Sequence, residues 1–344
     1  MRHVAETMHE YAKKVYDLLS SDKEKEIQVF PHARVDGDCL GTAVALSSAL
    51  RKLGLLSKVV LECEIPPRLA FMSIPSDLYY VVTEETKEEI RSRQAVAFAV
   101  DCSESKRMGA AEVLFEKAEK TVILDHHVSS APKTEYSYVD GKSASCAELL
   151  YLLIKEWEEM TGLTLVERFE ADWLMVGIQS DSGRFSYENT RAGTFRIAAE
   201  LMERGANVTK NAYHLFDETN EGKVRLHARA LSSMQLYADR RIAITGITLK
   251  MMEETGAPEG AADGIVNVLR DIDTVQVAFV VRENEDGELR VNCRSKESFD
   301  AAEFAQTMGG GGHHRAAGFS AKGISISDFM TRIVAEATAF MERA

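Results

Sequence analysis

The sequence predicts an α/β fold with two domains, the first built on a mostly parallel sheet flanked by helices. Two observations predict it. Short β-branched runs alternate with helical stretches over the first two thirds of the chain, and a second block of strands opens near residue 242. A chain of 344 residues with 45% hydrophobic residues is long and apolar enough for two cores. We expect a smaller C-terminal α/β domain, with a cleft between the two.

The first domain contains four short apolar runs that predict buried strands. These runs cover residues 27–30, 58–61, 95–100 and 121–124. Leu40, Ala43, Leu46 and Leu50 recur at intervals of three or four residues, so residues 38–53 are predicted as a helix with one apolar face. Gly54 would then end that helix, because glycine is the preferred residue just after a helix C-terminus.

The first 26 residues predict an amphipathic helix that precedes the sheet. Val4, Met8, Tyr11, Val15 and Leu18 follow one another at helical spacing and would form its apolar face. Two roles remain open for this face, packing on the sheet or contributing to a homodimer.

The second block of elements predicts the C-terminal domain. Its strands are expected at residues 242–247, 274–281 and 288–293, and its helices near 260–270, 301–308 and 327–342. We therefore divide the chain into a catalytic domain (1–216), a connector helix (217–237) and a smaller domain (238–344).

The composition argues against disulfide-rich proteins, structural zinc proteins, proteins with a long nucleic-acid groove and membrane-spanning proteins. The five cysteines are scattered and form no C-x-x-C pair, which argues against a disulfide framework and a structural zinc site. A formal net charge of −13 argues against a long nucleic-acid groove, which needs clustered Lys and Arg. No run approaches the roughly 18 apolar residues of a membrane span, and the charged N-terminus does not resemble a signal peptide. A cytoplasmic location without membrane contact is expected.

Acidic and imidazole side chains gather in four short segments where candidate strands finish. The segments are "PHARVDGDCLG" (31–41), "AVDCSES" (99–105), "LDHHVSS" (124–130) and "IQSDSGRF" (178–185). In a parallel sheet the carboxyl ends of the strands share one edge, so we expect Asp101, Asp125 and Asp181, each closing a strand, to meet there with His32, Asp36 and Asp38.

Five carboxylates at one edge repel one another unless cations are bound. Mixed carboxylate and imidazole ligation suits Mn²⁺. The ligands are too many for one ion, and two ions about 3.5 to 4 Å apart would use them and activate a water for attack on phosphorus.

Each residue also has an ordinary structural explanation. Asp36 and Asp38 fit the start of a helix, where Asp caps backbone N–H groups. His32 fits a partly buried histidine, and Asp101 and Asp181 fit turn positions. Cys39 beside the acidic residues is better explained by packing than by metal binding. The coincidence of four strand ends, each with a potential ligand, favours the metal site.

In this order and at these separations, "HARVDGD", "VDCS", "DHH" and "SDSGRF" resemble the four motifs of the DHH phosphoesterases. The later stretch "GGGGHHRAAG" (309–318) resembles the glycine-rich motif of the C-terminal domain that accompanies them. The resemblance spans essentially the whole chain and is closest to the bifunctional oligoribonuclease (nanoRNase) and pAp phosphatase subfamily.

The resemblance implies two metal ions that share one ligand. By motif position the first ion would be held by His32, Asp36 and Asp101, and the second by Asp38, Asp101, His126 and Asp181. His127 would then face the substrate as a phosphate-binding group or general acid. Asp125 would orient the histidine pair, as metal-bound imidazoles usually require.

The C-terminal motif implies a substrate-binding site. Out of context the glycines also fit a flexible linker, but glycine backbone can approach a phosphate closely and donate N–H bonds to it. The resemblance places a substrate-contacting histidine directly after them and a basic residue in "NCRSKES". A solvated surface position remains open for Arg294 and Lys296. The implied binding residues are Gly310, Gly311, Gly312, His313, His314, Arg294 and Lys296.

The activity that the resemblance implies is hydrolysis of oligonucleotides of about two to five units. An acidic surface, which disfavours long polyanions, is consistent with this preference. Dephosphorylation of 3′-phosphoadenosine 5′-phosphate (pAp) is a second expected activity. The alternative enzyme is a phosphodiesterase for cyclic di-AMP or its linear product pApA, although no transmembrane or sensory segment is seen before the catalytic motifs. A RecJ-like single-strand exonuclease and a non-catalytic nucleotide-binding module fit less well, the latter because all matched ligands are present.

Overall fold

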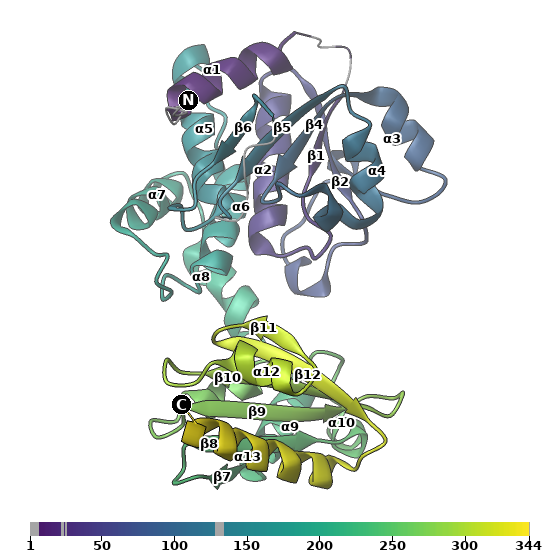
Figure 1. Ribbon diagram of the computed structural model, residues 1–344. Helices are drawn as coiled ribbons and strands as arrows, with labels where there is room; N and C mark the ends of the chain where they lie inside the picture. The colour runs from purple at the N-terminus through teal and green to yellow at the C-terminus, as the bar shows by residue number, and fades with distance from the viewer. Residues whose placement is uncertain (1–6, 22–23, 25, 128–133, 344) are drawn as a thin grey trace. The chain divides into compact units, whose positions relative to one another are not determined.

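The computed structural model describes residues 7–21, 24, 26–127 and 134–343. It divides into two compact units, Met1–Glu218 and Thr219–Ala344, which are described separately (Figure 1). The segment 217–237, expected as a connector, contains α9 (Glu221–Ser232) and β7 (Gln235–Tyr237), and both pack on elements of the second unit. Across the described residues, no helix combines the length and apolar character needed to cross a bilayer.

The first unit is built on a six-stranded sheet with the order β3-β2-β1-β4-β5-β6. All of its strand pairs are parallel, which confirms the predicted sheet type. The strand order reverses between β1 and β4, and such a switch point opens a ligand-binding crevice at the carboxyl ends of the strands. The strands are β1 (Glu26–Phe30), β2 (Leu56–Leu61), β3 (Tyr79–Val81), β4 (Gln94–Val100), β5 (Lys120–Asp125) and β6 (Ser137–Val139).

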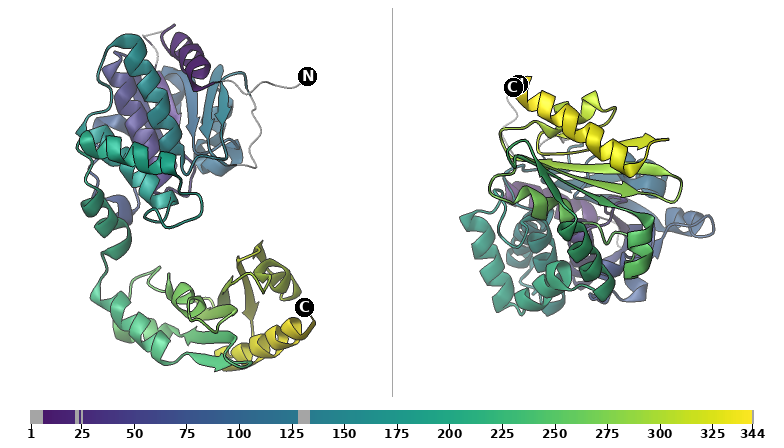
Figure 2. Two further views of the ribbon diagram at one scale, coloured as in Figure 1. Left: turned by 90° about the vertical axis from the view of Figure 1, so that its left-hand side faces the viewer. Right: turned by 90° about the horizontal axis from the view of Figure 1, so that it is seen from below.

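Helices cover both faces of this sheet (Figures 1 and 2). Successive strand residues point to opposite faces, so Val29 packs in the core under α1, α2, α5 and α6, whereas Phe30 packs with α3 and α4. The helices are α1 (Met8–Leu19), α2 (Gly37–Lys52), α3 (Lys87–Arg93), α4 (Glu112–Glu116), α5 (Cys146–Thr161), α6 (Arg168–Asp181), α7 (Ala192–Glu203) and α8 (Val208–Ala212).

The expectation that Asp181 closes a strand is wrong, because Asp181 is the last residue of helix α6. This helix packs against α2, α5, α7 and α8. Trp173, Leu174, Met175 and Val176 are therefore all buried, although they are consecutive. A helix buried on every side lacks a polar face, and its sequence looks like a short buried strand.

The predicted N-terminal helix is α1, and its apolar face packs within the first unit. Tyr11 and Val15 are buried against the core that includes α5. Trp157 Nε1 donates to the carbonyl of Ala12 at 3.0 Å, and the Tyr11 hydroxyl donates to the carbonyl of Ile123 at 2.9 Å. Val4 lies outside the described residues. These contacts correspond to packing on the sheet, and the homodimer stays a prediction.

The second unit contains a mixed six-stranded sheet with the order β11-β12-β10-β9-β8-β7. Among the strand pairs described for this sheet, β8 and β9 are parallel and the other four pairs are antiparallel. Helices α9, α10 and α11 cover one face, while α12 and α13 cover the other (Figure 2). Its remaining elements are β8 (Ile242–Ile247), α10 (Leu249–Thr255), α11 (Ile265–Arg270), β9 (Val277–Glu283), β10 (Glu288–Ser295), α12 (Ala301–Thr307), β11 (Gly311–His313), β12 (Ala316–Lys322) and α13 (Ile326–Arg343).

Candidate metal centre

The predicted ligands gather at the carboxyl ends of β1, β4 and β5, beside the switch point of the sheet. His32 and Asp36 follow β1, Asp101 follows β4, and Asp125 is the last residue of β5, with His126 directly after it. Three segments that are distant in sequence therefore meet at one edge, as parallel strand topology requires.

Two helix ends complete the cluster. Asp38 lies in the first turn of α2 and Asp181 at the end of α6, and these two helices pack closely together. The close approach depends on glycine, because a Cβ at Gly177 would lie 2.8 Å from Asp38 Oδ1 and 2.7 Å from the Cβ of Ala147. Asp38 is fully buried, and its oxygens accept hydrogen bonds from the first turn of α5.

The first ligand group consists of His32, Asp36 and Asp101. His32 Nε2 lies 3.5 Å from Asp36 Oδ2 and 3.3 Å from Asp101 Oδ2. Asp36 is also the N-cap of α2, since its Oδ1 accepts from the backbone N–H of Asp38 and Cys39 at 3.1 and 3.0 Å. Helix capping thus occupies one oxygen of Asp36 and orients the other toward the cluster, so the two explanations of this residue are compatible.

The second group consists of Asp38, Asp101, His126 and Asp181. His126 Nε2 lies 3.2 Å from Asp181 Oδ2, 3.3 Å from Asp101 Oδ1 and 3.7 Å from Asp38 Oδ2. One atom of each of Asp38, His126 and Asp181 lies within 4.8 Å of the others, the spacing of groups that can hold one ion.

Asp101 belongs to both groups, with Oδ2 facing His32 and Oδ1 facing His126. Its backbone is left-handed, with φ of 56°, a conformation that Asp tolerates better than most residues and that recurs at functional sites. Among the residues that the structure describes, Asp101 Oδ1 and His126 Nε2 are buried without a hydrogen-bond partner. Buried polar atoms nearly always have partners, so this pair of atoms fits metal ligands.

The pKa shifts within the cluster show that its carboxylates repel one another and favour a nearby positive charge. Burial would lower the pKa of His126, but Asp101 and Asp181 outweigh it and raise that pKa to about 11. Burial would also lower the pKa of His32, but Asp101 and Asp36 outweigh this effect and raise that pKa to about 9. Burial, followed by repulsion from Asp101 and Asp181, raises the pKa of Asp38. Bound cations would relieve this repulsion between carboxylates.

His127 occupies the rim of the cluster. Its Nδ1 lies 2.7 Å from Asp125 Oδ1, which also accepts the His127 backbone N–H at 3.1 Å. Asp125 is fully buried, whereas the His127 side chain is 37% exposed. Asp125 therefore orients His127, the more exposed of the two histidines, and leaves its Nε2 directed away from that bond.

Cys39 also lies within reach of the first group. Burial, followed by the charges of Asp36 and Asp101, raises the pKa of its thiol well above the usual range. The Sγ accepts a hydrogen bond from the Asp36 backbone N–H at 3.3 Å. A protonated thiol with a local bond agrees with a packing role, because only the thiolate ligates metals well.

In the second unit, two of the predicted substrate residues share one face of the sheet. Ala316 of β12 pairs in register with His313 of β11 on one side and with Arg294 of β10 on the other. Side chains in register on adjacent strands point to the same face, and two strand spacings separate them by about 10 Å. Arg294 is half-buried and His313 is exposed, so both are available to a ligand.

The predicted glycines do not form a flexible linker: Gly311 and Gly312 belong to a strand, and Gly310 directly precedes it. Gly311–His313 is β11. A Cβ at Gly310 would collide with the carbonyl of Gly318, and one at Gly312 would collide with that of Ala316. The close approach of β12 thus requires two of these glycines, while Gly311 has no described atom within 4 Å of an added Cβ.

The two remaining predicted binding residues already have partners. Lys296 Nζ donates to the carbonyls of Ile272 and Asp273 at 2.7 and 3.2 Å, and His314 Nδ1 lies 2.8 Å from Asp300 Oδ2. These bonds hold the Lys296 ammonium against backbone carbonyls, which gives it a structural role that the sequence did not indicate.

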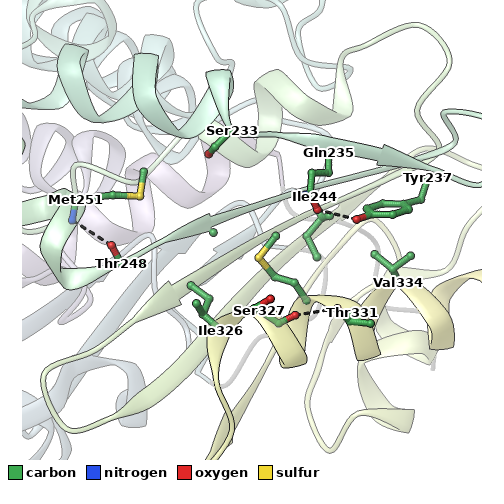
Figure 3. Close-up of a pocket in the computed structure, with 12 residues that line it drawn as sticks. Ser233, Gln235, Tyr237, Ile244, Thr248, Met251, Ile326, Ser327, Thr331 and Val334 are labelled. Atoms are coloured by element: carbon green, nitrogen blue, oxygen red, sulfur yellow. Dashed lines mark hydrogen bonds between the residues drawn. The ribbon is translucent and has the colours of Figure 1, made fainter.

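The second unit also contains a pocket of about 300 Å³ between β7, β8, α10 and α13 (Figure 3). Ile244, Gly246, Met251 and Met330 give it apolar walls. It opens on the sheet face that α13 covers, whereas Arg294 pairs with Ala278 of the opposite face. The lining contains none of the predicted site residues.

The sequence did not indicate the residues that form hydrogen bonds to the predicted ligands and orient them. Asn189 and the loop 143–145 contact the backbone of Asp181 and the ring of His126. Ser145 followed by Glu148 is a capping-box pattern and signals the start of α5. No local pattern connects that helix start, or Asn189, with a metal ligand.

Two domain families match the chain. Residues 26–178 match the DHH family, N-terminal domain, and residues 239–343 match the DHHA1 domain. The bifunctional oligoribonuclease and PAP phosphatase NrnA of Thermus thermophilus is 27% identical over 314 residues, which cover 90% of this chain and 89% of that protein. The protein of the same description from Bacillus subtilis is 26% identical over 289 residues, covering 84% and 87%.

Solved structures show the same fold. An exopolyphosphatase-related protein from Bacteroides fragilis has a TM-score of 0.82 at 20% identity and covers 96% of this chain and 97% of its own. RecJ from Thermus thermophilus, in complex with Mn²⁺, has a TM-score of 0.55 at 16% identity and covers 98% of this chain and 55% of its own.

Proposed function

The chain contains a DHH-family N-terminal domain followed by a DHHA1 domain, and from this premise we propose that it hydrolyses phosphoester bonds in very short oligonucleotides with the aid of metal ions. The products are mononucleotides, and pAp is a second substrate that yields AMP. Relatives that match over most of the chain carry both activities in their description.

The position of Asp101 carries this proposal. Its two carboxylate oxygens face two separate ligand groups, and one of them is buried among described residues without a hydrogen-bond partner. A shared carboxylate between two groups of nitrogen and oxygen ligands is the arrangement that a two-metal phosphoesterase needs.

We assign the first ion to His32, Asp36 and Asp101, and the second to Asp38, Asp101, His126 and Asp181. Imidazole and carboxylate ligands without thiolate favour Mn²⁺, the ion named for the similarly folded RecJ structure. When bound, two such ions supply an activated water and neutralise charge on the phosphoryl group.

His127 provides the proton transfer or phosphate contact in this proposal. Asp125 fixes its Nδ1, and the partly exposed ring leaves Nε2 for the substrate. A carboxylate behind an imidazole fixes its tautomer and the orientation of its ring, which general acid catalysis through Nε2 requires.

The second unit binds the substrate in this proposal. We assign a terminal phosphate to Arg294 and His313, which lie on the same face of the sheet in register with Ala316. A guanidinium binds phosphate through paired N–H groups, and the overall acidic charge disfavours long polyanions. In this proposal the first unit, Met1–Glu218, is the catalytic domain, and the second unit, Thr219–Ala344, which includes α9 and β7, is the substrate-binding domain.

Product analysis with Mn²⁺ tests the proposed function. The panel contains a labelled dinucleotide, a five-mer, a twenty-mer, pAp, cyclic di-AMP, pApA and pyrophosphate. We expect rapid cleavage of the dinucleotide, the five-mer and pAp, and slow cleavage of the twenty-mer. A preference for cyclic di-AMP or pApA would replace the proposal with second-messenger hydrolysis, and efficient digestion of the twenty-mer would replace it with a RecJ-like exonuclease.

A further inference from the structure

The segment 143–147, which leads into α5, contacts two members of the second ligand group. Ser143 O lies 3.4 Å from His126 Nδ1, so this carbonyl accepts a hydrogen bond from the Nδ1–H group when Nε2 faces the carboxylates. The backbone N–H groups of Cys146 and Ala147 donate to Asp38 Oδ2 and Oδ1 at 2.6 and 2.9 Å. One short stretch of backbone therefore orients both Asp38 and His126.

Bonds within the start of α5 hold this segment in shape. Glu148 Oε2 accepts from the Ser143 hydroxyl at 2.9 Å and from the Ala144 backbone N–H at 3.0 Å. The Glu148 backbone N–H donates in return to the Ser145 hydroxyl at 3.2 Å. The segment is thus a fixed support and not a free loop.

Asn189 joins the third member of the group to the same segment. Its Nδ2 donates to the carbonyl of Asp181 at 3.0 Å and to that of Ala144 at 2.9 Å. Asp181 is the last residue of α6, where helix carbonyls lack partners within the helix. Across the residues described, Asn189 Oδ1 is buried without a hydrogen-bond partner, so the two carbonyls account for the polar bonds of this side chain.

We infer that Asn189 is a positioning residue for the second ligand group: it fastens Asp181 to the segment that already orients Asp38 and His126. The inference rests on the proposed metal centre. Without the amide, Asp181 is free to move away with the end of α6, while Asp38 and His126 keep their support. Residues behind metal ligands typically change metal affinity or activity by about 10- to 100-fold when removed.

Asn211, which lies in α8, provides a matched control because its side chain also bonds to a residue of α6. Its Nδ2 donates to the Asp172 carbonyl and carboxylate at 3.4 and 3.5 Å, and its Oδ1 is likewise buried without a partner in the described part of the chain. Asn189→Ala and Asn211→Ala both remove a buried amide from a carbonyl of α6. Only the first removes it at a predicted ligand.

The test is a Mn²⁺ titration of the metal-free full chain, with free Mn²⁺ followed by electron paramagnetic resonance. We expect wild type to bind two ions and Asn189→Ala to bind one of them about 10- to 100-fold more weakly, with the other unchanged. The kcat of Asn189→Ala on the dinucleotide should recover as Mn²⁺ is raised. Asn211→Ala should keep both affinities, whatever its loss of melting temperature.

Asn189→Ser serves if the alanine variant fails to fold, because a serine hydroxyl is too short to reach both carbonyls and should give the same weakening. Unchanged affinities in both Asn189 variants, or equal weakening in Asn211→Ala, would overturn the inference. Failure of wild type to bind two ions would overturn the proposed metal centre itself, which separates the two failures.

Discussion

The two units present their predicted site residues in different ways. In the first unit His32, Asp38 and Asp101 are buried, and each has neighbouring ligands or backbone donors within hydrogen-bonding range. In the second unit His313 is exposed, and the half-buried Arg294 donates a hydrogen bond to the carbonyl of Cys293 at 2.9 Å. In the proposed function the first unit performs the chemistry with buried, preorganised groups and the second binds the substrate with more exposed ones. We therefore expect substitutions to affect kcat in the first unit and KM in the second.

Loss of the shared carboxylate should have the largest effect. Asp101→Asn should lower kcat on the dinucleotide by more than about 100-fold. Loss of a residue that only orients a metal ligand usually lowers activity by about 10- to 100-fold, and Asp101 is itself a proposed ligand of both ions. Single-turnover rates at saturating Mn²⁺ measure it. A kcat within a few-fold of wild type would contradict the role of Asp101 in both groups.

Loss of the group behind His127 should have the next largest effect. Asp125→Asn removes the charge that orients the ring and should lower kcat by about 10- to 100-fold while the content of bound Mn²⁺ stays the same. The pair of measurements is kcat and metal content by elemental analysis. A parallel loss of metal would show that Asp125 supports the ligands and not His127.

In the second unit, Arg294→Ala should raise KM. Loss of a charge-assisted hydrogen bond predicts an increase of about 10- to 100-fold for pAp, with a smaller change for bis-p-nitrophenyl phosphate, which lacks a terminal phosphate. Arg290→Ala is the matched control, since Arg290 lies on the same face of β10 but pairs with Glu288 at 2.8 Å. Equal increases for both substrates, or for both variants, would remove Arg294 from phosphate binding.

Substitutions of Gly310 and Gly311 should have the smallest effects, and these effects are on the stability of the fold. Gly310→Ala should destabilise the chain by about 1 to 3 kcal/mol because its Cβ meets the Gly318 carbonyl. Gly311→Ala should change stability by less than about 0.5 kcal/mol, because no described atom lies near its added Cβ. Denaturant unfolding compares the two variants. Equal destabilisation would mean that β11 packs differently from the structure.

The sequence predicted the strand ends well because buried parallel strands are apolar throughout and finish at polar residues. The run 121–124 followed by Asp125 and His126 is an example, since β5 ends at Asp125. It failed for Asp181, because a helix buried on all sides has the composition of a buried strand. It also failed to predict β11 and β12, whose Gly and Ala residues lack β propensity and pair only through neighbouring strands.

The candidate site likewise contains residues that the local sequence predicts and residues that it does not predict. Most of the side chains proposed to bind metal could be predicted because Asp and His after a strand are visible in the local sequence. Asp181, at the end of α6, was assigned through the resemblance of "SDSGRF" to a DHH motif. Asn189 and the segment 143–147 could not, because their importance arises from hydrogen bonds between residues 8 and 45 positions apart in the chain. Tertiary structure alone brings such supports to the ligands.

The stoichiometry of Mn²⁺ binding to wild type and Asp101→Asn, measured by equilibrium dialysis, tests most directly whether Asp101 serves two ions at once. We expect two ions per wild-type chain and weakened binding of both in the variant. Wild type with a single ion, or a variant that loses one ion and keeps the other at full affinity, would contradict it.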